Sequence, residues 1–193
     1  MAEADELVYK RLRMMHGVPE GRTDMTDAIP LECGLEYFNG ISFNKGCYVG
    51  QELMARVHYK GVVRKSLVSL AVVPSSTTAD SDDGWLQATP PSDDSLFPID
   101  WRIESDDRVP TLPSGAELTA PDGTKAGKLV SQCGALAFGL LRLEQLHASN
   151  GRAMTVTMTT PTTTAGTDAS TSPTIVRLRP IMPSWWSRLQ VPQ

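Results

Sequence analysis

A four-residue turn signal, Pro121-Asp122-Gly123-Thr124, constrains the fold of this chain more than any other feature. Proline, aspartate and glycine stand where a tight turn requires them, and an apolar segment on each side predicts a β-hairpin from residues 116–120 and 125–131. Several short strands separated by turn signals favour an antiparallel β-barrel. Four further segments have the β-branched and apolar composition of such strands: 66–73, 135–143, 154–158 and 174–178.

The first third of the chain has helix-like spacing of its apolar residues. Residues 4–15 and 51–59 carry apolar side chains every three or four positions and are predicted to be helices. Gly17 is placed to end the first helix. We expect a polar loop over 21–30 and, over 31–43, a brief helix or turn followed by a short strand.

The run KGCYVGQE at residues 45–52 concentrates the chemically capable groups of the chain. Its two glycines allow tight backbone conformations and close approach, which leaves the thiol of Cys47 reachable. Lys45 beside that thiol, with Arg56 close in space, would favour the thiolate, the form that attacks electrophiles or binds metal. Glu52 and Arg56 are four residues apart on the predicted helix and are expected to pair. The alternative is a buried cysteine in a tight turn.

The run KGCYVGQE followed by Arg56 resembles the signature of the YgfZ family of folate-binding-like proteins, whose mitochondrial members are assembly factors for iron-sulfur proteins. Downstream of the signature, the segment HYKGVVRK at 58–65 resembles the mitochondrial branch of the family more than the bacterial branch. The related aminomethyltransferases of glycine cleavage share the fold and a similar loop but carry no cysteine at this place. The matching segments outside the signature are RLR at 11–13, HGVPEG at 16–21, IPLE at 29–32, NGISF at 39–43, HYKGVVRK at 58–65, AGKLVS at 126–131 and ALAFGLLR at 135–142.

The resemblance implies an α+β fold: the C-terminal part of a glycine-cleavage T-protein-like fold, in which a short α/β segment precedes an antiparallel β-barrel. Residues 1–63 would be the remnant of the folate-binding-like domain, 64–180 the barrel and 181–193 a tail. Within the barrel we expect a disordered insertion at about 74–113 and a Thr-rich loop at about 159–172. In the family the signature lies in the second half of a longer chain, so we expect the N-terminal half to be missing, through an alternative start or a truncation.

By the same resemblance, the chain is expected to promote formation of 4Fe-4S clusters in enzymes of the mitochondrial matrix, with Cys47 as its working thiol. Iron-sulfur scaffold proteins and recipient 4Fe-4S enzymes would be its partners, and tetrahydrofolate a weakly bound cofactor. Turnover chemistry is not required. The alternatives are a folate-dependent aminomethyltransferase-like enzyme and an inactive fragment. The implied site residues are Cys47, Lys45 and Arg56 for the chemistry, and Gly46, Tyr48, Gly50, Gln51 and Glu52 for a folate-site-like wall.

The three cysteines, Cys33, Cys47 and Cys133, limit what the chain can do with iron. They form no CxxC pair and no metal-ligand spacing. A stable iron-sulfur cluster usually takes four thiolates. We therefore expect no stably bound metal, and any ligation by Cys47 would be transient, with further ligands from a partner, a second copy or a small thiol.

Charge and motifs exclude other classes of function. The formal net charge of -4 gives no general attraction to nucleic acid or to an anionic membrane. No glycine-rich phosphate loop is present, and no apolar stretch reaches the roughly 20 residues that span a bilayer. The N-terminal residues lack the Arg-rich, acidic-poor composition of a mitochondrial presequence, which we expect to have been lost with the missing half. His16, His58 and His147 share no hydrolytic motif and are predicted to be structural or surface residues.

Overall fold

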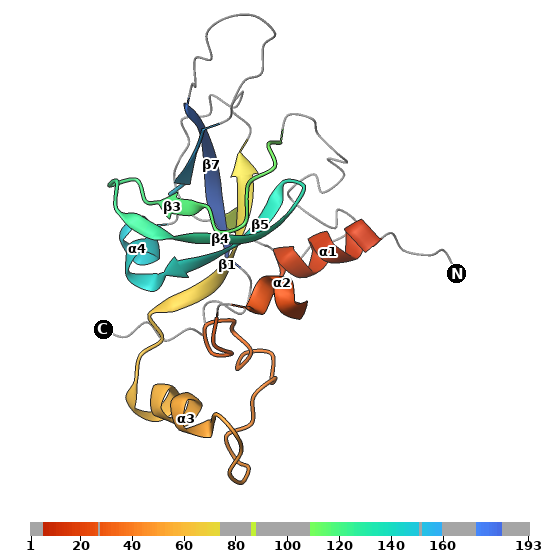
Figure 1. Ribbon diagram of the computed structural model, residues 1–193, viewed down its shortest axis with the longest axis vertical. Coiled ribbons are helices and arrows are strands. Elements are labelled where there is room, and N and C mark those ends of the chain that lie inside the picture. The colour runs from red at the N-terminus through yellow and green to blue at the C-terminus, as the bar shows by residue number, and fades with distance from the viewer. Residues whose placement is uncertain are drawn as a thin grey trace, which may run out of the picture.

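Six strands close into an antiparallel β-barrel in the computed structural model, which describes residues 6–26, 28–73, 86–87, 109–150, 152–159 and 173–182 (Figure 1). A two-residue strand, β2 (Leu86–Gln87), pairs in parallel with the last barrel strand. The predicted α+β class with a C-terminal antiparallel barrel is confirmed. Around the barrel the strands follow one another as β1 (Lys65–Val73), β5 (Leu136–Arg142), β4 (Lys125–Cys133), β3 (Glu117–Thr119), β6 (Met154–Thr159) and β7 (Pro173–Met182), which pairs back with β1.

The hairpin of β3 and β4 forms at the predicted turn. The backbone N–H of Gly123 donates to the Ala120 carbonyl at 2.9 Å. The Asp122 carboxylate accepts hydrogen bonds from the hydroxyl and the backbone N–H of Thr124, at 2.6 and 2.9 Å. These bonds lower the pKa of Asp122, because they stabilise its charged form. The local turn chemistry therefore sets the register of this hairpin.

The barrel interior is filled by fully buried aliphatic side chains from every part of the sheet, among them Leu118, Leu129 and Leu178. Each such side chain stabilises the fold by about 1.5–3 kcal/mol relative to an exposed position. A short helix, α4 (Leu143–Ala148), covers the barrel with Leu146, which is also fully buried. The sequence did not predict this helix, because six residues are too few for a helical period to be recognised beside an apolar strand.

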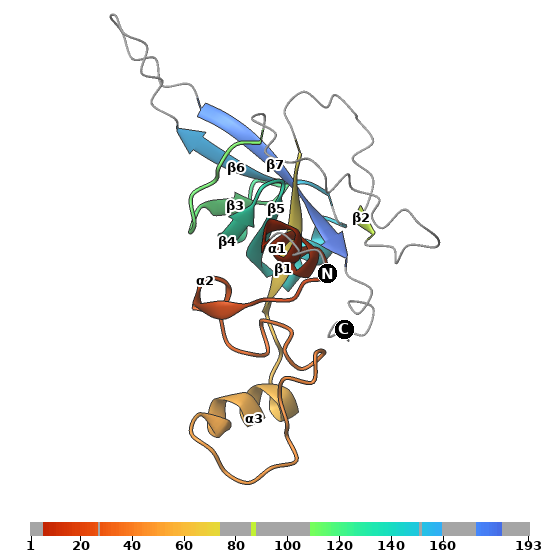
Figure 2. The same cartoon turned by 90° about the vertical axis from the view of Figure 1, so that its right-hand side faces the viewer.

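Helix α1 (Glu6–Met15) packs on the outside of the barrel (Figure 2). Its buried residues Met14 and Met15 contact a second apolar cluster that includes Leu67 and Phe138. The hydroxyl of Ser69, on β1, donates to the Met14 carbonyl at 2.5 Å. The helix that was predicted from the spacing of its apolar residues is thus held by both packing and a buried hydrogen bond.

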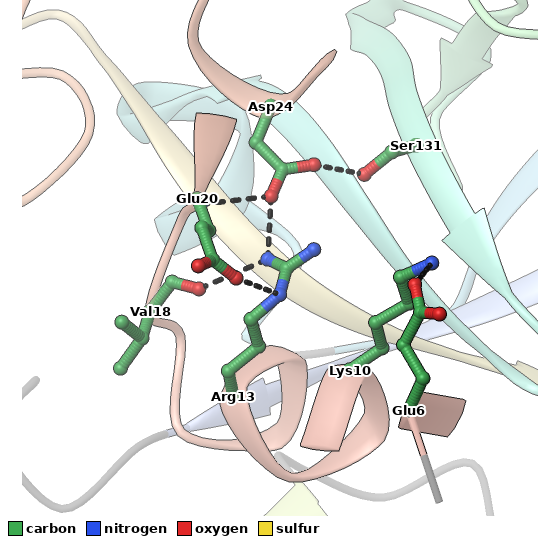
Figure 3. A network of polar contacts seen from close by, with 7 residues as sticks. All are labelled: Glu6, Lys10, Arg13, Val18, Glu20, Asp24 and Ser131. Carbon is green, nitrogen blue, oxygen red and sulfur yellow. Dashed lines mark hydrogen bonds and ion pairs between the residues drawn. The ribbon is translucent and has the colours of Figure 1, made fainter. Parts of the chain in front are cut away.

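Helix α2 (Gly21–Met25) replaces the polar loop that was predicted over residues 21–30. Asp24 is 2% exposed, and its carboxylate accepts from Arg13 Nη1 at 2.5 Å, Ser131 Oγ at 2.6 Å and the backbone N–H of Glu20 at 3.0 Å (Figure 3). This network ties α1 and α2 to strand β4. The prediction was wrong because the helix depends on a partner far away in the sequence.

Residues 28–64, which we call the signature segment, extend away from the barrel in both views and end in helix α3 (Gln51–Lys60) (Figures 1 and 2). The short strand predicted within 31–43 is absent: this described stretch is a series of turns. Its residues donate backbone hydrogen bonds to carbonyls three to five positions earlier, as from Leu35 to Pro30 at 3.2 Å and from Gly40 to Leu35 at 2.8 Å. The segment is anchored to β1 where Leu67 N–H donates to the Glu32 carbonyl at 2.8 Å.

Most of the predicted insertion at 74–113, the Thr-rich loop at 159–172 and the tail at 181–193 lie outside the described residues. Residues 109–113 lead into the β3 hairpin, where Leu112 is buried and its backbone N–H donates to Gln132 Oε1 at 2.7 Å. Strand β7 continues to Met182, past the expected domain boundary at 180.

Candidate functional site: the cysteine loop

The run KGCYVGQE forms an open loop that passes directly into α3. Gly50 is the N-cap of the helix and has φ 86° and ψ 0°, in the left-handed region where a residue with a Cβ is strained. The backbone N–H of Gln51 donates to the Tyr48 carbonyl at 3.2 Å, which starts the first helical turn. The glycine therefore lets the chain turn sharply, and the loop with Cys47 stands just before the helix.

Cys47 is exposed, whereas Cys33 is buried and Cys133 is half-buried. The expectation of an accessible thiol at position 47 is confirmed, and the alternative of a buried cysteine in that turn is wrong. Burial raises the pKa of the Cys33 thiol to about 11, and the nearby carboxylates of Glu32 and Asp24 add to this shift. Cys33 thus has the character of a structural cysteine, and Cys47 that of a thiol available to a partner.

The two cations predicted to lie near the thiol have other partners. The Lys45 ammonium lies 4.3 Å from the centroid of the Tyr48 ring, a cation–π contact. Arg56 Nη2 lies 2.5 Å from Glu52 Oε1, so the predicted pair on α3 is confirmed. Its side chains are 66% and 85% exposed, and such a pair contributes only about 0.3–0.5 kcal/mol. Both contacts shape the loop and the helix that flank Cys47.

A cluster that sequence reasoning missed holds the ends of the loop together; we call it the aromatic clamp (Glu36, Phe43, His58 and Tyr59). The rings of Phe43 and His58 stack at 3.7 Å with an interplanar angle of 12°, and His58 Nδ1 lies 3.2 Å from Glu36 Oε1. The Tyr59 ring meets both rings edge-on, at 6.2 and 4.7 Å. Because Phe43 precedes the loop and His58 lies in the last turn of α3, the clamp fixes the span that carries Cys47.

The residues expected to form a folate-site-like wall stand in open surroundings. A Cβ added at Gly46 or Gly50 would meet no heavy atom within 4 Å. Val49 between them is 102% exposed. Pockets for a ligand of folate size usually bury most of its surface. These residues do not by themselves enclose a folate.

Neither a metal cluster nor a membrane span is found in the part of the chain that the structure describes. No group of three or more His, Cys, Asp or Glu side chains there is placed to hold a metal ion. No helix among the same residues has the length and apolar character to cross a bilayer.

Comparison with known proteins supports the resemblance noted in the signature. Residues 96–188 match the C-terminal β-barrel domain of CAF17. A protein of Aspergillus fumigatus named iron-sulfur cluster assembly factor IBA57 homolog, mitochondrial, is 31% identical over 95% of this chain. The chain belongs to the IBA57/CAF17 family. The IBA57 homolog of Mycosarcoma maydis is 33% identical over 94% of the chain, and human IBA57 is 54% identical over 61 residues, or 31% of the chain.

The similarity to IBA57 covers less than half of each relative. The matched region is 40% of the Aspergillus fumigatus protein, 45% of the Mycosarcoma maydis protein and 17% of the human protein. The family predicted from KGCYVGQE and its neighbouring segments is nonetheless confirmed.

Proposed function

We propose that this chain acts in the assembly of iron-sulfur clusters in mitochondria, with Cys47 as its working thiol. The observation that supports this function best is the exposure of Cys47 on a loop at the start of α3. A thiolate is the form of cysteine that binds iron. The relatives named iron-sulfur cluster assembly factors supply the class of process.

In this proposal a cluster in transit is the substrate, and Cys47 is one of its temporary ligands. The thiol releases its proton to solvent, and a lone pair of Cys47 Sγ forms a bond to iron as one ligand of the donor protein leaves. The reverse exchange hands the iron to the recipient, so no electron is gained or lost. Three cysteines cannot supply four ligands, and the remaining ligands would come from the scaffold protein or the recipient 4Fe-4S enzyme.

The surroundings of Cys47 suit such a transfer. Val49 and Leu53, on the loop and the first turn of α3, are 102% and 52% exposed. Apolar side chains beside a reachable thiol offer contact area to a partner protein, because their burial against it is favourable. The aromatic clamp limits the movement of the loop while its outer side stays accessible.

Two finer points belong to the same proposal. Since the relatives carry the word mitochondrial in their names, we place the chain in the mitochondrion and, more specifically, in the matrix. Tetrahydrofolate would bind this chain only weakly, because Gly46, Gly50 and their neighbours form an open surface. Equilibrium titration with tetrahydrofolate tests this point: saturable tight binding would favour the aminomethyltransferase-like alternative.

Replacement of Cys47 by serine tests the proposed function. Cells depleted of the protein are complemented with the wild type, Cys47→Ser or the matched control Cys133→Ser, and aconitase activity is measured at equal protein abundance. We expect Cys47→Ser to leave aconitase as low as in the depleted cells and Cys133→Ser to restore it. Full restoration by Cys47→Ser would eliminate the thiol mechanism.

A further inference from the structure

A groove lies on the outer face of the barrel, beside α2 and over strands β4 and β5. It consists of two cavities, of about 450 and about 200 Å³, which share Gly115, Lys128 and Leu140 in their walls. The cavities therefore adjoin and can be occupied by one elongated ligand.

The larger cavity has a wall of hydroxyl groups. Thr26 Oγ1 donates to the Arg22 carbonyl, and Ser114 Oγ donates to the Val130 carbonyl at 2.7 Å. With their protons so used, these oxygens retain lone pairs that can accept hydrogen bonds. Acceptors along an elongated cavity suit the backbone N–H groups of an extended peptide.

The backbone of Gly127 forms part of the wall of the smaller cavity. A Cβ at Gly127 would come within 2.2 Å of the Leu140 carbonyl oxygen, so no other residue fits between β4 and β5 at this point. Gly127 has no side chain, so its backbone lines the cavity directly. A ligand in this cavity can thus approach the sheet closely.

The rim of the smaller cavity is basic. Among the described residues of this rim, the side chains of Lys65, Lys125, Lys128 and Arg142 stand against one carboxylate, that of Glu117, and Glu117 already pairs with Lys125.

Lys65 and Arg142 stand directly opposite each other in the register of β1 and β5, and both are exposed. Like charges in that position destabilise a sheet. Among the described residues, no carboxylate forms an ion pair with either of them. An anionic ligand would remove this repulsion.

We propose that this groove binds an extended acidic segment of a partner protein. Its carboxylates lie at Lys65 and Arg142, and its backbone follows the hydroxyl wall beside α2. A peptide is favoured over a small anion because the larger cavity continues away from the basic rim. Nucleic acid is disfavoured by the net charge of -4 and the pI of about 5.4. The proposal does not depend on Cys47, which lies in the signature segment.

Fluorescence anisotropy of the whole chain with a labelled peptide tests this site. The probe is an acidic peptide of alternating Glu and Ser, about ten residues or roughly 33 Å when extended, and a Lys-Ser peptide of the same length is its control. We expect Lys65→Glu and Arg142→Glu each to weaken binding by about tenfold and added salt to weaken it further. Glu117→Gln should tighten binding, since it removes a carboxylate from the rim. Lys10→Glu, a matched change on α1, and Cys47→Ser should leave it unchanged.

Four outcomes would overturn the proposal that this groove binds an acidic segment of a partner protein. Equal binding by Arg142→Glu and the wild type, or equal binding of the Lys-Ser peptide, would show that the groove does not read acidic side chains. Displacement of the peptide by citrate at the same concentration would indicate a site for a small anion. Tighter binding after the aspartates of residues 93–107 are changed to asparagine would identify the chain itself as the occupant. If either charge-reversal variant fails to fold, as judged by far-UV circular dichroism, the neutral variants Lys65→Gln and Arg142→Gln replace it in the binding assay. We then expect a smaller loss of peptide affinity than for the charge reversals.

Discussion

The barrel and the signature segment are stabilised in different ways. Barrel side chains such as Leu118, Phe138 and Met154 are fully buried, whereas Val49 and Tyr59 in the signature segment are 102% and 66% exposed. The barrel is held by a closed sheet and a continuous apolar core, while the segment buries fewer apolar side chains and depends also on the aromatic clamp, an exposed ion pair and its anchor to β1. The proposed working thiol therefore lies on the region that buries less apolar surface, and its exposure leaves it accessible to a partner.

The sharpest test of this contrast is Phe138→Ala. The Phe138 ring is fully buried against Met14 and Met15, and its removal leaves a cavity between α1 and the barrel. We expect the free energy of unfolding to fall by about 3–5 kcal/mol. Urea denaturation followed by circular dichroism measures it. Val49→Ala in the signature segment is the control, with a change within about 0.5 kcal/mol; similar losses in both variants would contradict the contrast.

The next largest effect is expected at the network that joins α2 to the barrel. Asp24→Ala removes the main partner of Arg13, whose side chain is only 13% exposed. Glu20 Oε2 remains 3.3 Å from Arg13 Nε but is exposed, so the loss of the buried carboxylate should still cost about 3 kcal/mol of unfolding free energy. The same denaturation experiment measures this loss. The double variant Arg13→Met with Asp24→Leu should recover part of it, and a double variant less stable than Asp24→Ala would show that the charge is not the cause.

A smaller effect is expected from Cys33 at high pH. Its pKa is about 11 in the folded chain, against an ordinary value of 9.0. Between about pH 9 and pH 11 the unfolded chain loses the thiol proton and the folded chain keeps it, so the stability that Cys33 contributes falls as pH rises through this window. Below it, the contribution is constant.

The comparison with Cys33→Ala isolates this titration from those of lysine and tyrosine. The difference in unfolding free energy between the wild type and Cys33→Ala should change above pH 9 in favour of the variant. A constant difference across the window would mean that the thiol is not desolvated in the folded chain.

The smallest effect is expected in the aromatic clamp. His58→Ala removes the stack on Phe43 and the contact with Glu36, which together contribute about 1 kcal/mol. Amide hydrogen exchange over residues 44–50 should speed up, while the barrel amides and the melting temperature stay unchanged. Lys60→Ala, in the same helical turn, is the control. Equal protection of the loop in His58→Ala would show that the clamp does not hold it.

Features that depend on neighbouring residues were predictable from the sequence, and features that depend on distant ones were not. The hairpin at Pro121–Thr124 and the pair of Glu52 and Arg56 follow from contacts within a few positions. The carboxylate of Asp24, in contrast, meets Ser131 across 107 positions of the chain. No pattern within residues 21–30 indicates that contact, which is why α2 was predicted as a loop.

The same distinction applies to the candidate site. The two loop glycines correctly indicated an accessible Cys47. The charge of Lys45 was expected beside the thiol, and the structure shows in addition its contact with the Tyr48 ring, which the flexible four-carbon side chain of lysine can reach. The contact of His58 with Glu36 joins residues 22 positions apart in the sequence. No periodic pattern links these two positions, so the contact could not be predicted from the sequence.

The hydrogen bond from Leu67 to Glu32 means that the chain leaves the barrel and comes back to it at nearly the same point. Everything between these residues, the thiol included, forms one excursion with a single base. Deletion of residues 33–64 would therefore leave every residue of the barrel strands in place.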